Sequence, residues 1–457
     1  MGIVRESHKY CGHPSLLFDV LPPLSQRSYS NKASNMAQEA QVHVVSKTNS
    51  LEHHTITTNV SHLPALAPDS IRARTRLVSL TANNLTYARH AFIANWWDAF
   101  PVPTFLPSPY NDTTVYGIVP VWGYAEITAS QITGLEVGMI LYGFWPSSTL
   151  PVDLQLKPTE PAGHYIDDTP HRQSMWSYYH RYTFTPQSLN LESPSLAAET
   201  VFRPLFECAH ALNAYVLGPI AVHPAPKTAS SPTWAHADLR NAAVISLAAS
   251  GKTARVFNDA VLNTRQTSKG PRAFLAITSN PSTLSLPNPE PSPIKTRILS
   301  YTAALSEDLP SFLTSLSPTP SKILIADFGA RNNCLAPLIS HLRAHLPTST
   351  AIAVVGVGGE PNPLTQPIDV AALLAGMAAV PERVQMNTSE VREAVVEVIG
   401  AEVYFEGVRE GWEGFCERGG CGGVKVEVGK GIGEFEEGWA KLCAGEAASV
   451  GGLAYLL

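Results

Sequence analysis

The sequence has none of the long apolar runs, about 18 residues or more, that cross a bilayer as a helix. We therefore expect no membrane-spanning segment. Cysteine is also scarce, with 6 residues among 457. The cysteines are scattered, so we interpret them as free thiols of a reducing compartment and not as a disulfide framework. They are Cys11, Cys208, Cys334, Cys416, Cys421 and Cys443.

Charge is sparse as well. Charged residues make up 15% of the chain, the net charge is −6 at pH 7, and no basic stripe is visible. A nucleic-acid-binding surface needs clustered Lys and Arg, so nucleic acid is excluded as a partner. A hydrophobic content of 44% is typical of a globular protein. The length is sufficient for two or more domains with a large core.

Metal-ligand spacing is absent from the aromatic-rich stretch 164–182, because neither His-x-x-x-His nor His-Glu-x-x-His occurs there. The aromatic-rich stretch 164–182 does concentrate histidines and aspartates, but without that spacing. We therefore expect no functional metal, and we interpret residues 166–182 as a polar segment that crosses between domains. The polar residues of this stretch are His164, His171, His180, Asp167 and Asp168.

The first 40 residues differ from the rest of the chain. Basic residues outnumber acidic ones and serine is frequent. We interpret residues 1–40 as a disordered tail of a cytoplasmic protein, with a mitochondrial targeting segment as the alternative. Truncation at Met36 should leave the fold intact.

Residues 41–195 are predicted to form a β-rich domain, a small barrel or sandwich. Tyr87, Asn83 and Asn84 follow the third of these strands. Asparagine often closes a turn by bonding its own backbone, which is the plainest interpretation of this polar group. Trp122, Tyr124 and Tyr142 are either core or one wall of a cleft that stacks a planar ring. The predicted strands are 42–46, 54–60, 73–80, 116–127 and 137–146.

Residues 196–385 alternate short apolar runs with helical patterns, which predicts a doubly wound parallel sheet. The expected helices are 199–217 (broken near Pro204), 309–316 and 335–346. Residues 386–457 should complete the sheet or return to the barrel, with helices at 391–398 and 435–447 and strands at 424–428 and 453–457. The strands of the parallel sheet are 242–247, 274–278, 298–301, 322–327 and 351–357.

The strand at 242–247 leads through the small residues of 248–251 into a helical pattern. Such a turn exposes backbone N–H groups at a helix start, which favours phosphate. Lys252 and Thr253 add a cation and a hydroxyl. Only Gly251 is glycine, so the dinucleotide fingerprint is incomplete. A Walker A loop would need glycine at Ser246, so we reject a P-loop ATPase, and an ordinary turn that binds nothing remains the alternative.

Ligands of doubly wound sheets bind at the carboxyl ends of the strands. The second strand ends without the acid that would accept the ribose hydroxyls of NAD, so NADPH is the expected cofactor and NADH the alternative. The candidate cofactor-binding residues are Ser246, Ala249, Ser250, Gly251, Lys252, Thr253, Ser279, Asn280, Gly329 and Gly356.

Five segments together resemble the DUF2855 family, which looks like a divergent, zinc-free branch of the medium-chain dehydrogenase/reductases. The resemblance implies a GroES-like β-barrel domain, a Rossmann-type domain and a cleft between them. The segments are NNLTYA at 83–88, YGIVPVWGYAEI at 116–127, LYGFWP at 141–146, RPLF at 203–206 and AASGKTA at 248–254.

Carried over by position, the resemblance implies that Asn84 and Tyr87 line the cleft as catalytic residues. Ser250 to Thr253 match the family's Ser-Ser-Lys-Thr loop, with Gly251 replacing one serine. The implied function is a zinc-independent, NADPH-dependent reductase of a conjugated carbonyl or quinone. The alternative is a non-catalytic nucleotide-binding or interaction protein on the same fold, and a homodimer built by edge-strand pairing fits either. The candidate substrate-binding residues are Asn83, Trp122, Tyr124 and Tyr142.

Overall fold

The computed structural model describes residues 39–185, 189–265, 267–287, 293–369, 371, 379–420, 424–446 and 451–457. The expected tail, residues 1–40, therefore lies almost wholly outside the described residues, as do Cys11 and Cys421. Within these ranges, no helix is both long and apolar enough to cross a membrane.

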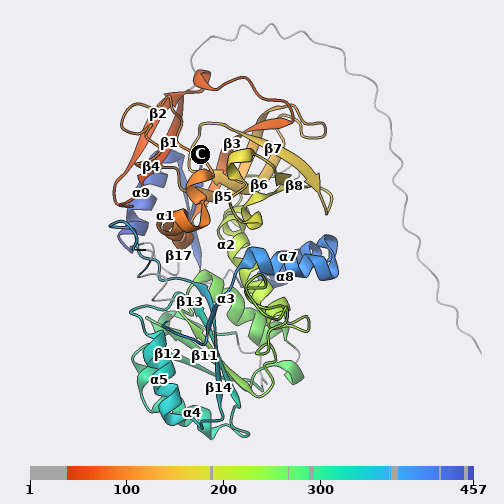
Figure 1. The fold of residues 1–457 in the computed structure, drawn as a ribbon, viewed down its shortest axis with the longest axis vertical. Coiled ribbons are helices and arrows are strands. Elements are labelled where there is room, and N and C mark those ends of the chain that lie inside the picture. The colour runs from red at the N-terminus through yellow and green to blue at the C-terminus, as the bar shows by residue number, and fades with distance from the viewer. Residues whose placement is uncertain are drawn as a thin grey trace, which may run out of the picture. The chain divides into compact units, whose positions relative to one another are not determined.

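Six antiparallel strands close into a barrel (Figure 1), as the sequence predicts. Their order is β3-β5-β6-β9-β8-β7, and β7 pairs back with β3. Residues 166–182 do not cross between domains, so that interpretation is wrong: they contribute the end of β8 and the start of β9. The barrel strands are β3 (Ser70–Leu80), β5 (Pro120–Ser130), β6 (Ile140–Pro146), β7 (Val152–Thr159), β8 (His164–Asp167) and β9 (Arg181–Thr185).

The pattern of β3 explains its place in the barrel. Ile71 and Ala73 are buried, while Arg72 and Arg76 are partly exposed and pair with acids on neighbouring strands. Gly123 of β5 lies so close to β3 that an added Cβ would be 2.1 Å from the Leu77 carbonyl oxygen. Glycine is therefore required where these two strands approach closely.

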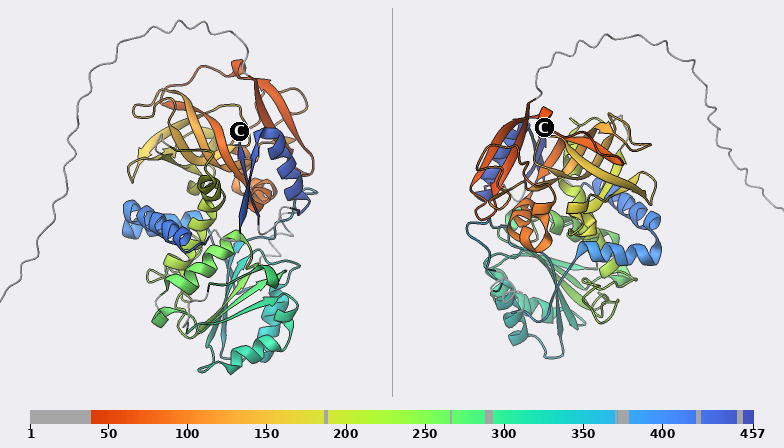
Figure 2. Two further views of the ribbon diagram at one scale, coloured as in Figure 1. Left: turned by 180° about the vertical axis from the view of Figure 1, so that it is seen from behind. Right: turned by 45° about the horizontal axis from the view of Figure 1, so that its top comes forward.

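Two strands near the end of the described chain extend the barrel sheet, and three others form a sheet of their own. β17 (Gly451–Leu456) pairs with β3, and β16 (Lys425–Lys430) pairs with β17, so the final strand lies on the barrel. β1 (Glu39–Ser46), β2 (His53–Asn59) and β4 (Tyr116–Gly117) form a separate three-stranded sheet. Helix α9 (Gly431–Cys443) lies along β1 and β2 (Figure 2), where the Trp439 indole donates to the Ser50 carbonyl at 2.9 Å.

A helix, α1 (Ala82–Ala94), follows β3 directly, so the turn expected around the asparagines is wrong. Thr81 caps this helix in an extended conformation. The Asn84 Oδ1 accepts the Thr81 backbone N–H at 2.8 Å, which satisfies a donor at the helix start. The asparagine does bond the backbone, but it begins a helix instead of closing a turn.

The second large sheet contains six parallel strands in the order β12-β11-β10-β13-β14-β15. Numbered along the chain this is 3-2-1-4-5-6, the order of the Rossmann fold, which confirms the predicted fold class. Val244 packs into one core and Ile245 into another, because both faces are covered. The strands are β10 (Ala242–Leu247), β11 (Ala273–Thr278), β12 (Lys295–Ser300), β13 (Lys322–Phe328), β14 (Ala351–Gly358) and β15 (Arg383–Gln385).

Helix α2 (Pro194–Ala211) precedes this sheet and continues through Pro204, so the predicted break is wrong. Packing of its apolar face offsets the one hydrogen bond that proline removes. The buried Glu207 of α2 accepts from Arg392 at 2.6 Å and from the Tyr404 hydroxyl at 3.0 Å. The other helices are α3 (Lys252–Asp259), α4 (Asp308–Ser315), α5 (Leu335–His345), α7 (Thr388–Ile399) and α8 (Ala401–Glu417).

Candidate functional site

The turn after β10 joins the carboxyl ends of two central strands. Ala248 has φ +55°, and the Ala249 N–H donates to the Ile277 carbonyl of β11 at 3.0 Å. The Gly251 N–H donates to the Ala248 carbonyl at 2.8 Å, and α3 begins at Lys252. The predicted strand, tight turn and helix are therefore present, with the helix start beside the switch point of the sheet order.

Lys252 is a cation without a counterion. The residue is partly exposed. Its side chain makes neither an ion pair nor a hydrogen bond within the described ranges. Burial, and to a smaller extent the nearby Arg255 guanidinium, lower its pKa to about 8. An incoming anion would relieve this unfavourable charge.

Arg255 is a residue of this turn that the sequence reasoning missed. Its Nε donates to the Ser250 carbonyl at 3.0 Å, which folds the guanidinium back over the turn. Its Nη2 is buried and has no hydrogen-bond partner in the part of the chain that the structure describes. The available signal was its spacing, since Lys252 and Arg255 are three residues apart on one helix face.

Ser250 connects this turn to the end of β11. The Thr278 hydroxyl donates to the Ser250 hydroxyl at 2.9 Å. Ser279 and Asn280 follow and are exposed, with the Asn280 Oδ1 accepting from the Ser282 hydroxyl. The structure therefore brings the end of β11 to the Lys252 turn.

The remaining residues of the β10 turn differ in access. Ala249 is fully buried, and Thr253 is partly exposed. Ser246 is fully buried within β10, and its hydroxyl has no partner among the described residues. Of these three, only Thr253 is open to a ligand in this conformation.

At Gly329 and Gly356, near the ends of β13 and β14, close neighbours leave no space for a side chain. Gly329 has φ +109°, and an added Cβ would lie 2.4 Å from the Gly359 carbonyl oxygen. A Cβ on Gly356 would collide with the Arg383 guanidinium at 2.4 Å. Arg383 in turn lies 3.6 Å from the Asp327 carboxylate. Both glycines therefore serve the close approach of strand ends, and their proposed cofactor contacts stay predictions.

Tyr87 lies on α1 and is only 5% exposed. Its hydroxyl accepts a hydrogen bond from the Trp122 indole N–H at 3.0 Å, and the side chains of Asn83 and Tyr179 also hydrogen-bond it. Burial raises the pKa of Tyr87 to about 12. The structure thus brings three of the predicted barrel residues into one buried polar group.

Asn84 is also buried and uses both ends of its amide inside the fold. Its Oδ1 caps α1, and its Nδ2 donates to the Pro120 carbonyl of β5 at 2.9 Å. The side chain therefore fixes α1 against β5.

Tyr124 and Tyr142 lie edge to face on adjacent strands, against α2. The Tyr124 hydroxyl donates to Glu199 at 3.2 Å, and the Arg203 guanidinium lies 3.9 Å from the centre of the Tyr142 ring. The Tyr142 hydroxyl is buried and unpartnered within the described ranges. Trp122 stacks on Tyr142 at 5.8 Å, so the aromatic wall expected from the sequence exists as a packed cluster.

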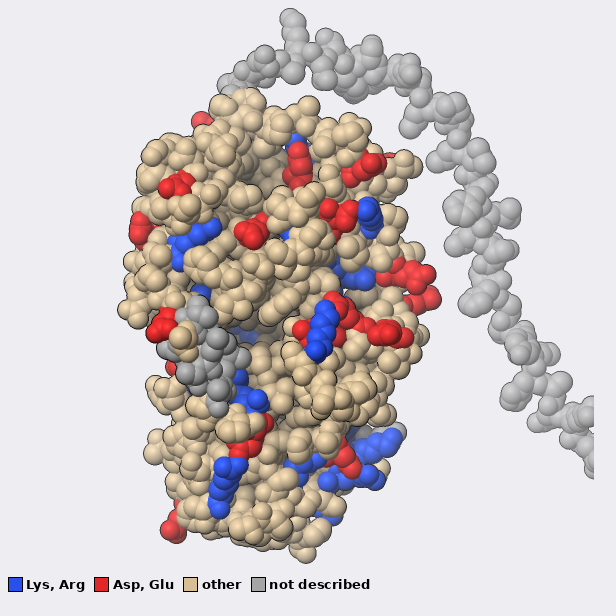
Figure 3. All heavy atoms as spheres, in the orientation of Figure 1, with Lys and Arg blue, Asp and Glu red and all other residues tan. Residues whose placement is uncertain are grey.

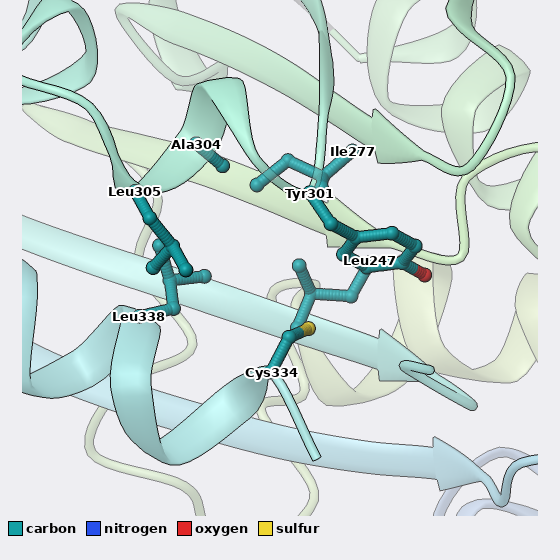
Figure 4. A pocket seen from close by; sticks show the side chains of 7 residues that line it. All are labelled: Leu247, Ile277, Tyr301, Ala304, Leu305, Cys334 and Leu338. Carbon is teal, nitrogen blue, oxygen red and sulfur yellow. The ribbon is translucent and has the colours of Figure 1, made fainter. Parts of the chain in front are cut away.

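Two hollows among the described residues are an apolar niche and a barrel cavity, and neither is lined by Tyr87, Asn84 or Gly251. An apolar niche beside the ends of β10 and β11 has no room for a water molecule (Figure 4). A cavity of about 220 Å³ on the barrel is lined mainly by proline, aromatic and aliphatic side chains, including Phe100, Pro103 and Phe105. The niche is lined by Leu247, Ile277, Tyr301, Ala304, Leu305, Cys334 and Leu338.

Surface charge on one face and metal-type ligands among the described residues are two further features that bear on where ligands bind. On the face drawn in Figure 3, Lys and Arg are interspersed with Asp and Glu and form no stripe. The described residues contain no group of three or more His, Cys, Asp or Glu that could hold a metal ion.

The closed antiparallel barrel and the 3-2-1-4-5-6 parallel sheet together give the architecture that the resemblance implies, that of the medium-chain dehydrogenase/reductases. The family model described as "Protein of unknown function (DUF2855)" matches residues 78–448. The chain therefore belongs to the DUF2855 family.

Solved structures are also similar to this chain. One is CurA in complex with NADPH from Vibrio vulnificus, with 11% identity, 91% of this chain and 98% of that chain covered, and a TM-score of 0.47. Another is a mutant form of enoyl thioester reductase from Candida tropicalis, with 9% identity, 92% and 100% covered, and a TM-score of 0.49. No curated protein matches the chain in sequence.

Proposed function

We propose that this chain binds NADPH at the turn between β10 and α3 and reduces a conjugated carbonyl or quinone without zinc. The observation that carries the proposal is the pair of cations, Lys252 and Arg255, which have no carboxylate partner in the described ranges. They lie at the carboxyl end of the first Rossmann strand, where sheets of this order bind ligands.

The residues of the turn suit a phosphate group. The first backbone N–H groups of α3 and the helix dipole favour an anion at Lys252. The ammonium group adds a charge-assisted contact, and Thr253 supplies a hydroxyl. Ser279 and Asn280 at the end of β11 carry no negative charge, which favours NADPH over NADH because no carboxylate repels a 2′-phosphate.

When bound, NADPH supplies a hydride. The chain would have to position the substrate and stabilise the oxygen that gains charge. Tyr87 is the candidate proton donor, since a pKa of about 12 keeps its hydroxyl protonated at neutral pH. Asn84 is the candidate second catalytic residue, and Asn83, Trp122, Tyr124 and Tyr142 are the candidate substrate wall.

A specific observation favours a second function, that of a nucleotide-binding protein without turnover. Tyr87 is buried, and both ends of the Asn84 amide are already satisfied inside the fold. A substrate could reach these groups only after α1 or its neighbours moved.

The test is a titration of the full-length protein with NADPH, NADH and ATP, followed by tryptophan fluorescence, with energy transfer to the reduced nicotinamide as an additional signal for NADPH and NADH. Binding of NADPH supports the proposal. If the protein binds none of the three nucleotides, the proposal is refuted. Turnover of a panel of quinones and enones then separates the reductase from the non-catalytic alternative. Lys252→Ala should weaken NADPH binding by about 1–2 kcal/mol, whereas Lys441→Ala, on the exposed face of α9, should not.

We also propose that the protein forms a homodimer and that its domains meet near residues 40, 195 and 385. Edge strands suited to dimer formation are β12 and β15 of the parallel sheet and β16 of the barrel sheet. Light scattering at micromolar concentration would show whether the protein is a dimer. The boundaries near residues 40, 195 and 385 could be tested by limited proteolysis.

A further inference from the structure

We propose that Lys252 and Arg255 together bind the 2′-phosphate of NADPH. The turn between β10 and α3 would thus recognise a phosphate monoester. The inference rests on the proposed function and names the residues that would select NADPH over NADH. It assigns to Arg255 a role that the sequence reasoning did not give it.

The first argument is position. Arg255 Nε is 3.0 Å from the Ser250 carbonyl, and the Ser250 hydroxyl is 2.9 Å from that of Thr278, the last residue of β11. The guanidinium is therefore tied to the end of the second strand. In a Rossmann sheet this strand end meets the adenosine ribose, and a nearby arginine can accommodate its 2′-phosphate.

The second argument is charge. The Arg255 guanidinium is close enough to lower the pKa of Lys252, yet neither residue forms an ion pair within the described ranges. A phosphate monoester carries about −1.5 to −2 charges at neutral pH on one compact group, which matches two adjacent cations. The buried Arg255 Nη2 also lacks a hydrogen-bond partner among the described residues, and a phosphate oxygen could supply one if the guanidinium moved toward the surface of the turn.

Two arginines near the far end of α3 are already engaged. Arg418 is paired with Asp259 of α3 at 2.7 Å. Arg265 donates to the Asn213 side chain and carbonyl, both at 2.7 Å. Of these three arginines, only Arg255 has a buried guanidinium nitrogen without a partner among the described residues.

The experiment is calorimetry on the full-length protein with four probes: 2′,5′-ADP, 5′-ADP, NADPH and NADH. We expect 2′,5′-ADP to bind about tenfold or more tightly than 5′-ADP, and NADPH to be preferred over NADH by a similar factor. Arg255→Gln should remove this preference by weakening NADPH and leaving NADH unchanged. The control is Arg240→Gln, an exposed arginine paired with Asp238 before β10, which should change neither affinity.

Equal affinity of the wild type for NADPH and NADH would overturn the inference while leaving nucleotide binding intact. A loss of both affinities to the same degree in Arg255→Gln, in a variant with an unchanged Tm, would also overturn it. Should Arg255→Gln fail to fold, the comparison of the two ADP isomers on the wild type decides. If none of the four probes binds, the proposed function itself fails.

Discussion

The indole N–H of Trp122 donates a hydrogen bond to the Tyr87 hydroxyl across 3.0 Å, joining β5 to α1 in the buried interior. Tyr87→Phe would leave this indole donor short of an acceptor. We expect a loss of about 1–3 kcal/mol of unfolding free energy, measured by urea denaturation. If Tyr87 is also the proton donor, turnover should fall while NADPH affinity holds.

The matched control for this change is Tyr142→Phe, because the Tyr142 hydroxyl is buried without a partner among the described residues. Its removal should be neutral or slightly stabilising. Equal destabilisation by the two substitutions would show that the Trp122–Tyr87 bond contributes nothing specific.

The affinity for NADPH should depend on pH through Lys252. Its pKa is lowered to about 8, first by burial and then by Arg255, so the ammonium loses its proton as the pH rises through that value. The charged form binds phosphate, so affinity should be highest below about pH 8 and fall above it. Fluorescence titrations from about pH 7 to about pH 9.5 would show the decrease, and Lys252→Ala should flatten the profile across that range.

Two adjacent aspartates should differ sharply in their effect on stability. Asp167 and Arg172 form an ion pair 3.0 Å apart with both side chains fully buried. Asp167→Asn would leave the guanidinium uncompensated and should cost about 3–5 kcal/mol. Asp168 pairs with Lys157 at the exposed surface, so Asp168→Asn should cost about 1 kcal/mol or less. Similar Tm values for the two variants would contradict the assignment of a buried pair.

The end of β13 should tolerate no side chain at Gly329. Its positive φ and the 2.4 Å approach of the Gly359 carbonyl oxygen both oppose a Cβ, so Gly329→Ala should lower stability by about 1–3 kcal/mol. An added Cβ on Gly359 meets nothing within 4 Å, so Gly359→Ala serves as the control. Thermal denaturation of both variants measures the difference.

The sequence predicts both sheets well because their patterns are local. Runs such as Ala242–Leu247 are apolar on both faces, and this pattern is typical of a parallel strand covered by helices. Helix α8 was missed because its glycines suggest a loop. Gly411 is small because the His210 ring of α2 would lie 2.9 Å from an added Cβ, so tertiary packing overrides weak helix propensity there.

The candidate site is predictable only in part, for a similar reason. The small residues before Lys252 indicate an anion-binding turn, and the structure contains that turn. The role of Arg255 depends on its folding back onto the Ser250 carbonyl, which no periodicity reveals. The partners of Tyr87 come from β5 and from the segment around Tyr179, so its burial follows from contacts distant in sequence.

The pairing of β17 with β3 constrains how the protein is made. β3 ends at Leu80, whereas β17 begins at Gly451, so the Leu77–Leu80 part of that edge of β3 has no partner until residues 451–456 have been made. At about 5–20 residues per second, that interval lasts from roughly 20 seconds to more than a minute. Throughout it, β3 exposes unpaired N–H and C=O groups that could join another chain. The strands of the parallel sheet meet their partners sooner, so we expect this edge of the barrel to stay open to wrong pairing for longest during synthesis.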